Sequence, residues 1–198
     1  MINDGLPVGA TPLTPDDAKG LIPKGLSTRG HLDQFESRNI EQGLIWAIRG
    51  KKKPADILSI DFCLKLHKQM FNKTWEWAGQ FRRYEVNIGN TPPVMISMSV
   101  RNLLDDVLTW IEFGTYPLDE ICIRFHHRLV YIHPFPNGNG RHSRIIADLL
   151  LKALGQPLFA WGANANLTTA SKDRIDYIAA LRTADAGNYA SLLHFARA

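Results

Sequence analysis

The chain has few cysteines and no long apolar run. Its 198 residues include only Cys63 and Cys122, which lie in separate apolar stretches and form no CxxC pair. This pattern argues against a disulfide framework and against a cysteine metal site. No stretch approaches the roughly 18 apolar residues of a membrane span, and the N-terminal residues lack the basic and apolar regions of a secretion signal. We therefore expect a cytoplasmic protein without a membrane partner.

Clustered charge is also lacking. The net charge is +4, which allows an anionic ligand, but the basic residues are scattered and the only run is 51–53. No helix-turn-helix pattern accompanies them, so we predict no specific nucleic-acid partner. Hydrophobic residues make up 45% of the chain, which suits a folded body with a sizeable core.

Helical periodicity dominates what remains. Gly, Pro and Thr are frequent in residues 1–26, which predicts an N-terminal arm, whereas 27–198 reads as one domain. Apolar positions recur at helical spacing over 28–49, 57–77, 100–113, 121–132, 141–154 and 171–182, and again briefly at the C-terminus. Two β-prone runs, 84–88 and 94–98, flank a turn-rich segment and predict a small hairpin-like flap. The expected fold class is mainly α, a helical bundle with one small β-hairpin flap.

The segment between the two helical patterns 121–132 and 141–154 is chemically distinctive. It reads His-Pro-Phe-Pro-Asn-Gly-Asn-Gly-Arg-His-Ser-Arg from His133 to Arg144. Glycines that lead directly into a helix let backbone N–H groups point at an anion. Arg141 and Arg144 share one face of the first helical turn, where the helix dipole disfavours cations by roughly 0.3–1 kcal/mol each. An anion such as phosphate would explain their position.

His133 lies at the end of the preceding helical pattern and is the candidate general base, because histidine is suited to proton transfer near neutral pH. Simple packing at a helix end is the alternative for a lone histidine. A zinc site built from His126, His127, His133 and His142 is less favoured, since no HExxH or Cys/His spacing occurs.

These residues resemble the Fic family, whose signature is HPFx[D/E]GNGRxxR. Asn137 stands at the acidic position, the one departure from the signature. The resemblance extends over roughly 33–195: Trp77 to Arg82 resembles the family's AGxxR segment, 87–96 takes the place of its flap, and 177–182 resembles its C-terminal helix. The N-terminal Thr-Pro-Leu-Thr-Pro and the loop together resemble the subgroup called mobile mystery protein B.

The resemblance implies a protein adenylyltransferase that moves AMP from ATP to a Tyr, Ser or Thr hydroxyl of a target protein. His133 would take the hydroxyl proton, and Phe135 would anchor the loop. The phosphates would be held by Gly138, Asn139, Gly140, Arg141 and Arg144. Mg²⁺ would accompany ATP, with Asn137 as a weak ligand because its neutral amide supplies no negative charge.

The flap would present the target through backbone hydrogen bonds, as an added strand. The residues implied are Asn87, Ile88, Pro93, Val94 and Met95. A hairpin without any partner is the alternative.

Glu36 is a candidate inhibitory residue. Many Fic proteins have a helix with the pattern [S/T]xxxE[G/N], whose glutamate pairs with the second signature arginine, here Arg144. The helix expected at about 28–49 keeps the glutamate but not the flanking residues. The alternative is a solvent-facing glutamate in a weak surface ion pair.

Two other functions stay open. One is a kinase like the Doc branch of the same fold, although Asn139-Gly140-Arg141 favours the AMP-transferring branch. The other is a non-catalytic nucleotide-binding or protein-binding module with Asn137 as a relic, working beside an antitoxin-like partner.

Overall fold

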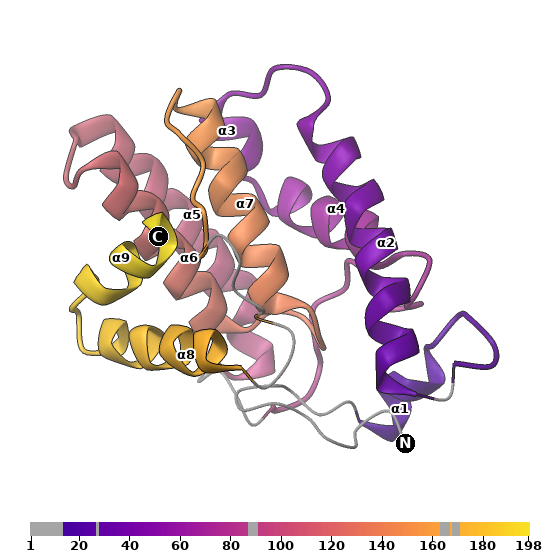
Figure 1. The fold of residues 1–198 in the computed structure, drawn as a ribbon. Coiled ribbons are helices and arrows are strands. Elements are labelled where there is room, and N and C mark those ends of the chain that lie inside the picture. The colour runs from indigo at the N-terminus through magenta and orange to yellow at the C-terminus, as the bar shows by residue number, and fades with distance from the viewer. Residues whose placement is uncertain (1–13, 27, 87–90, 163–166, 168–170) are drawn as a thin grey trace.

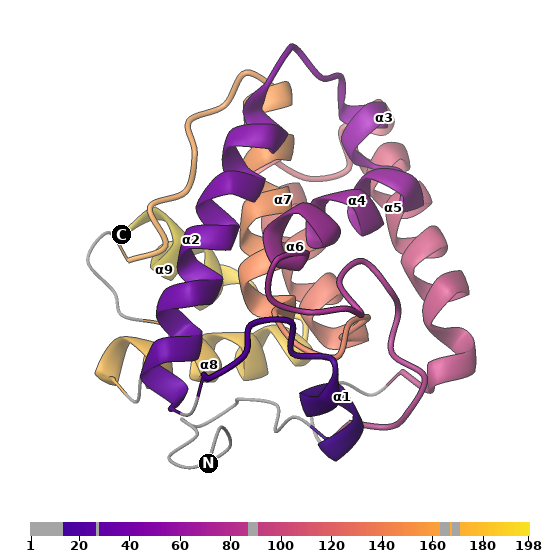
Figure 2. The ribbon, with the colours of Figure 1, turned by 90° about the vertical axis from the view of Figure 1, so that its right-hand side faces the viewer.

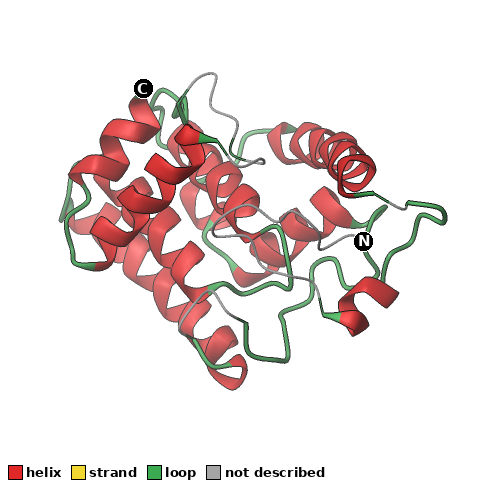
Figure 3. Ribbon diagram, turned by 60° about the horizontal axis from the view of Figure 1, so that its bottom comes forward, coloured by secondary structure: helices red, strands yellow, loops and turns green. Residues whose placement is uncertain are grey.

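The computed structural model describes residues 14–26, 28–86, 91–162, 167 and 171–198, and nearly all of its regular structure is helical (Figures 1 and 3). In chain order the elements are α1 (Pro15–Lys19), α2 (Arg29–Ile48), α3 (Pro54–Ile57), α4 (Ile60–Phe71), the 3-10 helix η1 (Pro93–Met95), α5 (Ile96–Phe113), α6 (Leu118–Ile132), α7 (Asn139–Ala153), α8 (Lys172–Asp185) and α9 (Ala190–Arg197). Within these residues no strand forms, and the single β-bridge recorded joins Leu21 to Trp75.

Helix α7 lies in the middle of the bundle (Figure 1). It packs against α6, which packs in turn against α5, while α2 lies against α4 on the other side (Figure 2). Helices α8 and α9 pack on each other and close the remaining side. Gly43 permits the close approach of α2 to α4, because a Cβ there would lie 2.8 Å from the Met70 backbone nitrogen.

Local sequence signals fix where the helices begin. Three of them have a hydroxyl N-cap: Thr28 accepts from His31 N at the start of α2, Ser59 from Phe62 N before α4, and Ser171 from Arg174 N before α8. Such caps satisfy backbone N–H groups that have no partner within the helix. The expected mainly α fold is confirmed.

The core is formed by one cluster of apolar side chains, mostly from α4, α5, α6 and α7, with further members from α2, α3, α8 and α9. The largest fully buried side chains of the described residues include Trp75, Phe71, Phe125 and Phe135. Each such side chain contributes roughly 1.5–3 kcal/mol by leaving water. Phe135 belongs to the His133–Arg144 loop, so the loop is anchored in the core.

The helix predicted over 57–77 is wrong in extent. The chain forms α3 and α4 instead, and α4 ends at Phe71. The Asn39 side chain on α2 accepts from Lys73 N and Thr74 Oγ1, and Thr74 N donates to Phe71 O. The two bonds to Asn39 and the local turn at Thr74 direct the backbone away from the helical path, although the apolar periodicity continues.

The run 94–98, predicted as β-prone, is helical. Pro93, Val94 and Met95 form η1, and α5 begins at Ile96. Proline at the first helical position presets φ, and this favours a helix start over a strand. Asn87 and Ile88 lie outside the described residues.

The end of the predicted N-terminal arm is tied to the domain. Ile22 N donates to Thr74 O and Glu76 N donates to Gly20 O, on either side of the Leu21–Trp75 bridge. The bonds connect the arm to the segment that follows α4.

Candidate active site

The His133–Arg144 loop joins the C-terminus of α6 to the N-terminus of α7. His133 ends α6 with a left-handed backbone, φ 51°. The Asn139 side chain then closes the loop: Phe135 N donates to Asn139 Oδ1 at 2.9 Å, and Asn139 Nδ2 donates to Phe135 O at 2.8 Å. Both ends of this amide therefore hold the loop together, and the backbone N–H of Asn139 is the group that we expect to face a phosphate.

Gly138 caps α7 with φ 78° and has no room for a side chain. A Cβ there would lie 2.4 Å from Phe71 Cζ. The loop therefore lies directly on the α4 core and leads into α7, whose first N–H groups have no partner within the helix and are the kind of group that binds an anion.

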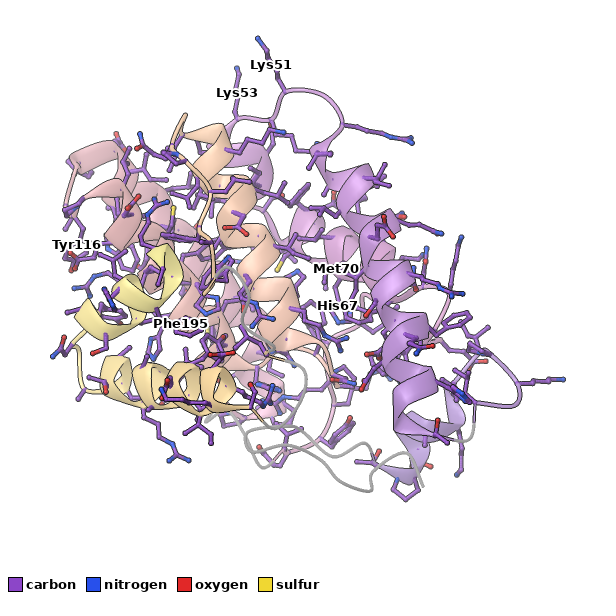
Figure 4. All side chains as sticks on the ribbon, in the orientation of Figure 1. Lys51, Lys53, His67, Met70, Tyr116 and Phe195 are labelled. Carbon is purple, nitrogen blue, oxygen red and sulfur yellow. The ribbon has the colours of Figure 1, made fainter. Side chains whose placement is uncertain are left out.

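His67 on α4 holds the loop from beneath, a role that the sequence analysis missed. Its ring stacks on Phe135 at 3.7 Å, and it lies inside the bundle (Figure 4). Gly79 N donates to Nδ1 at 2.9 Å, so Nε2 carries the proton and donates to Asn137 O at 3.1 Å. Burial lowers the pKa of His67 well below its usual value, in keeping with this neutral form.

His133 is buried, with 7% of its surface exposed. Its pKa is lowered to about 4, mainly by burial; a hydrogen bond to the Val130 backbone opposes this shift, and the nearby Arg82 charge contributes to it. The imidazole is therefore neutral at pH 7 and able to accept a proton.

Arg141 forms an ion pair with Glu36 on α2. Their Nη1 and Oε2 atoms are 2.7 Å apart, and Glu36 is fully buried. Trp75 Nε1 donates to the other carboxylate oxygen, Oε1, at 2.7 Å. The solvent-facing alternative for Glu36 is wrong. The expected pairing partner, Arg144, is also wrong, because the first of the two arginines points from α7 toward α2.

Arg144 points instead toward α8. Its guanidinium lies 5.5 Å from the ring centroid of Tyr177, whose hydroxyl is 3.0 Å from His126 Nε2. Burial lowers the pKa of His126 to about 3, and the Arg144 charge adds to this effect. The two signature arginines therefore leave the start of α7 in different directions, and both keep a partly exposed surface.

The described residues do not fit a magnesium site of their own. Gly138 N donates to Asn137 Oδ1 at 2.6 Å, and the atom of that amide left without a partner is Nδ2, a donor. A donor does not bind a cation. Among the described residues, no three His, Cys, Asp or Glu side chains form a group able to hold a metal ion.

Comparison with known proteins agrees with this geometry. The model of the Fic/DOC family matches residues 57–151, a segment that contains the whole loop. The chain is thus similar to the Fic/DOC family over nearly half of its length. Protein adenylyltransferase fic-1 of Caenorhabditis elegans is 29% identical over 173 residues, which cover 85% of this chain and 32% of that protein. The chain thus spans about a third of this curated relative's length.

Solved structures show the same fold. Fic-1 (residues 134–508) from C. elegans aligns with a TM-score of 0.60 at 23% identity, over 90% of this chain and 50% of that one. BepC from Bartonella tribocorum, solved with bound AMPPNP, aligns with a TM-score of 0.59 at 17% identity, over 93% and 97% of the two chains. The narrower resemblance to mobile mystery protein B stays a prediction.

Of the predicted site residues, the structure places His133, Asn137 to Arg141 and Arg144 on one loop and its helix start, with Glu36 against them. It adds His67 and Arg82, which reach this loop from α4 and from the segment after it. No helix in the described part of the chain is long and apolar enough to cross a membrane.

Proposed function

We propose that this chain is a protein adenylyltransferase, which transfers AMP from ATP to a hydroxyl group of another protein. The observation that carries the proposal is a buried neutral histidine directly before a helix N-terminus with two partly exposed arginines. The match to the Fic/DOC family model and the likeness to a protein adenylyltransferase support it. A protein target and a cytoplasmic place of action belong to the same proposal.

In this reaction His133 accepts the proton of the target hydroxyl. The hydroxyl oxygen then attacks the α-phosphorus of ATP, an ester bond forms, and pyrophosphate leaves. The backbone N–H groups around Gly138 to Gly140, together with Arg141 and Arg144, neutralise the phosphates. Positioning and charge neutralisation are what phosphoryl-type transfer requires of a protein. The described side chains offer Mg²⁺ no carboxylate ligand, so we assign no step to the metal.

The flap segment is the proposed platform for the target. Val94 and Met95 are 88% and 39% exposed, respectively, and with Pro93 they form the turn before α5. Exposed apolar side chains at such a turn can contact the side chains of an extended target segment, while the backbone of that target segment forms hydrogen bonds with the flap backbone.

We also propose that Glu36 inhibits the site. Its carboxylate takes the position that a phosphate oxygen would need at Arg141, and Trp75 fixes it there. In this proposal residues 1–26 form an arm, 27–198 form the Fic domain with α2 as its inhibitory helix, and an antitoxin-like partner acts on it.

The test uses ATP labelled at the α or the γ phosphate, with wild-type protein, His133→Ala and the matched control His31→Ala in lysate. His31 is exposed on α2 and lies outside the loop. Label from the α phosphate only, lost in His133→Ala and kept in His31→Ala, supports AMP transfer. Label from the γ phosphate only identifies a Doc-like kinase, and no His133-dependent label identifies a binding module.

A further inference from the structure

Arg82 is a buried cation whose side chain donates, among the described residues, to backbone carbonyl groups. Only 2% of its surface is exposed. Within the described residues no carboxylate pairs with it. Burying a guanidinium is costly, and an apolar side chain of the same length would fill the space at less cost. The arrangement of its donors explains why an arginine stands here.

Two of these carbonyls belong to the end of α6. Arg82 Nε donates to His133 O at 2.7 Å and Nη2 to Ile132 O at 3.4 Å, and its backbone N donates to Pro134 O at 2.9 Å. Carbonyls at a helix C-terminus have no intrahelical partner and carry the negative end of the dipole, so a cation stabilises them. The same bonds hold His133 in its left-handed conformation, which costs a non-glycine residue roughly 1–2 kcal/mol.

The other two carbonyls belong to the flap. Nη1 donates to Tyr84 O at 2.7 Å and Nη2 to Thr91 O at 2.6 Å. Tyr84 precedes the tip of the predicted flap and Thr91 follows it. One rigid, planar group therefore joins both ends of the flap to the backbone of the histidine.

We propose that Arg82 is a positioning residue that fixes the direction of the His133 side chain relative to the flap. The imidazole of His133 then lies where it can accept the proton of a target hydroxyl held at the flap. The guanidinium fork sets this geometry because its donors are coplanar and have fixed angles between them. Lysine, with one flexible ammonium group, cannot reproduce it. The part that concerns transfer rests on the proposed function, whereas the part that concerns His133 does not.

The first test measures the accessibility of His133 without any activity. Diethylpyrocarbonate modifies exposed neutral histidines, and trypsin releases residues 129–141 with His133 as the only histidine and residues 125–128 with His126 and His127. In Arg82→Lys and Arg82→Gln, we expect modification of the 129–141 peptide to rise by about threefold or more, with the 125–128 peptide unchanged.

Arg197→Lys is the matched control. Arg197, at the end of α9, also donates to two backbone carbonyls, Pro157 O at 3.0 Å and Leu158 O at 2.9 Å, and in addition it pairs with the Asp119 carboxylate. Its modification pattern should equal that of the wild type. An unchanged 129–141 peptide in both Arg82 variants would overturn the proposal. So would an equal rise in the two peptides, which would indicate general loosening.

The second test separates positioning from nucleotide binding. In Arg82→Lys, kcat for AMP transfer at saturating ATP should fall by about tenfold or more, while the Kd for ATP stays within about twofold of wild type. Equal losses in kcat and ATP affinity would contradict the proposal. If wild-type protein transfers no AMP, the proposed function fails, and the modification experiment still decides the role of Arg82.

Discussion

Replacing Glu36 by Gln should tighten ATP binding by removing the carboxylate that occupies Arg141. Glutamine keeps the size of the side chain, and its amide oxygen can still accept from Trp75 Nε1, which now lies 2.7 Å from Glu36 Oε1. Only the charge that competes with phosphate is lost. Glu36→Gly would also open a cavity and weaken α2 by about 1 kcal/mol, so it is the less specific change.

The magnitude follows from the burial of the pair. Removing one partner of a fully buried ion pair costs about 3–5 kcal/mol. Arg141 keeps 20% of its side chain exposed, and an incoming phosphate takes over from the carboxylate. We therefore estimate that displacing Glu36 weakens ATP binding by about 2 kcal/mol, which corresponds to a roughly 30-fold lower Kd in Glu36→Gln.

Calorimetric titration with a non-hydrolysable ATP analogue measures this Kd directly. Glu41→Gln is the matched control, because Glu41 is exposed on the same helix. The Kd of Glu41→Gln should equal that of wild type. At low ATP concentration, Glu36→Gln should incorporate more label than wild type because it binds ATP more tightly. Equal affinities of wild type, Glu36→Gln and Glu41→Gln would refute the view that Glu36 competes with phosphate.

Three further outcomes are expected. Asn137→Asp supplies the carboxylate ligand that the loop lacks, so the transfer rate should rise and depend more steeply on Mg²⁺; an unchanged Mg²⁺ titration of the folded variant would show that this position does not bind the metal. In a Glu36→Gln background, which leaves no buried carboxylate unpaired, Arg141→Ala should weaken ATP binding by about tenfold or more relative to Lys51→Ala, and equal calorimetric affinities would contradict direct phosphate contact. Burial lowers the pKa of His142 in the folded chain to about 4, below the ordinary 6.5 of a histidine, so the unfolded chain binds more protons as pH falls from 6.5 toward 4. Stability present above pH 6.5 should be lost over this window, by about 2 kcal/mol at pH 5 from His142 alone, and a urea midpoint that is the same at pH 7.5 and 5 would argue against this.

The contiguous part of the site was predictable because its chemistry is local. His133, the glycines and the two arginines lie within one loop and one helical turn, and the signature places them without knowledge of packing. Which arginine meets Glu36 was not predictable in this way. Residues three apart differ by about 60° around a helix, and the orientation of α7 toward α2 decides which of them reaches across.

The supporting residues were missed because their partners are distant in sequence. His67 contacts the Asn137 carbonyl 70 residues away, and Arg82 contacts His133 across 51 residues. A histidine within an apolar helical pattern and an arginine after a turn have no local signal for such roles. The strand expected over 94–98 failed for the opposite reason, since a local effect of Pro92 and Pro93 outweighed β propensity.

The contact between Gly138 and Phe71 bears on how such sequences diverge. Any larger residue at this position meets both a strained backbone and the aromatic ring, so its replacement would disrupt the loop whatever reaction the site performs. Asn137, by contrast, is partly exposed and can change without damage to the core. During evolutionary drift after a loss of activity, we expect the glycine to persist long after the neighbouring position has changed. The glycine therefore records descent and fold, and residue 137 is the more sensitive marker of surviving chemistry.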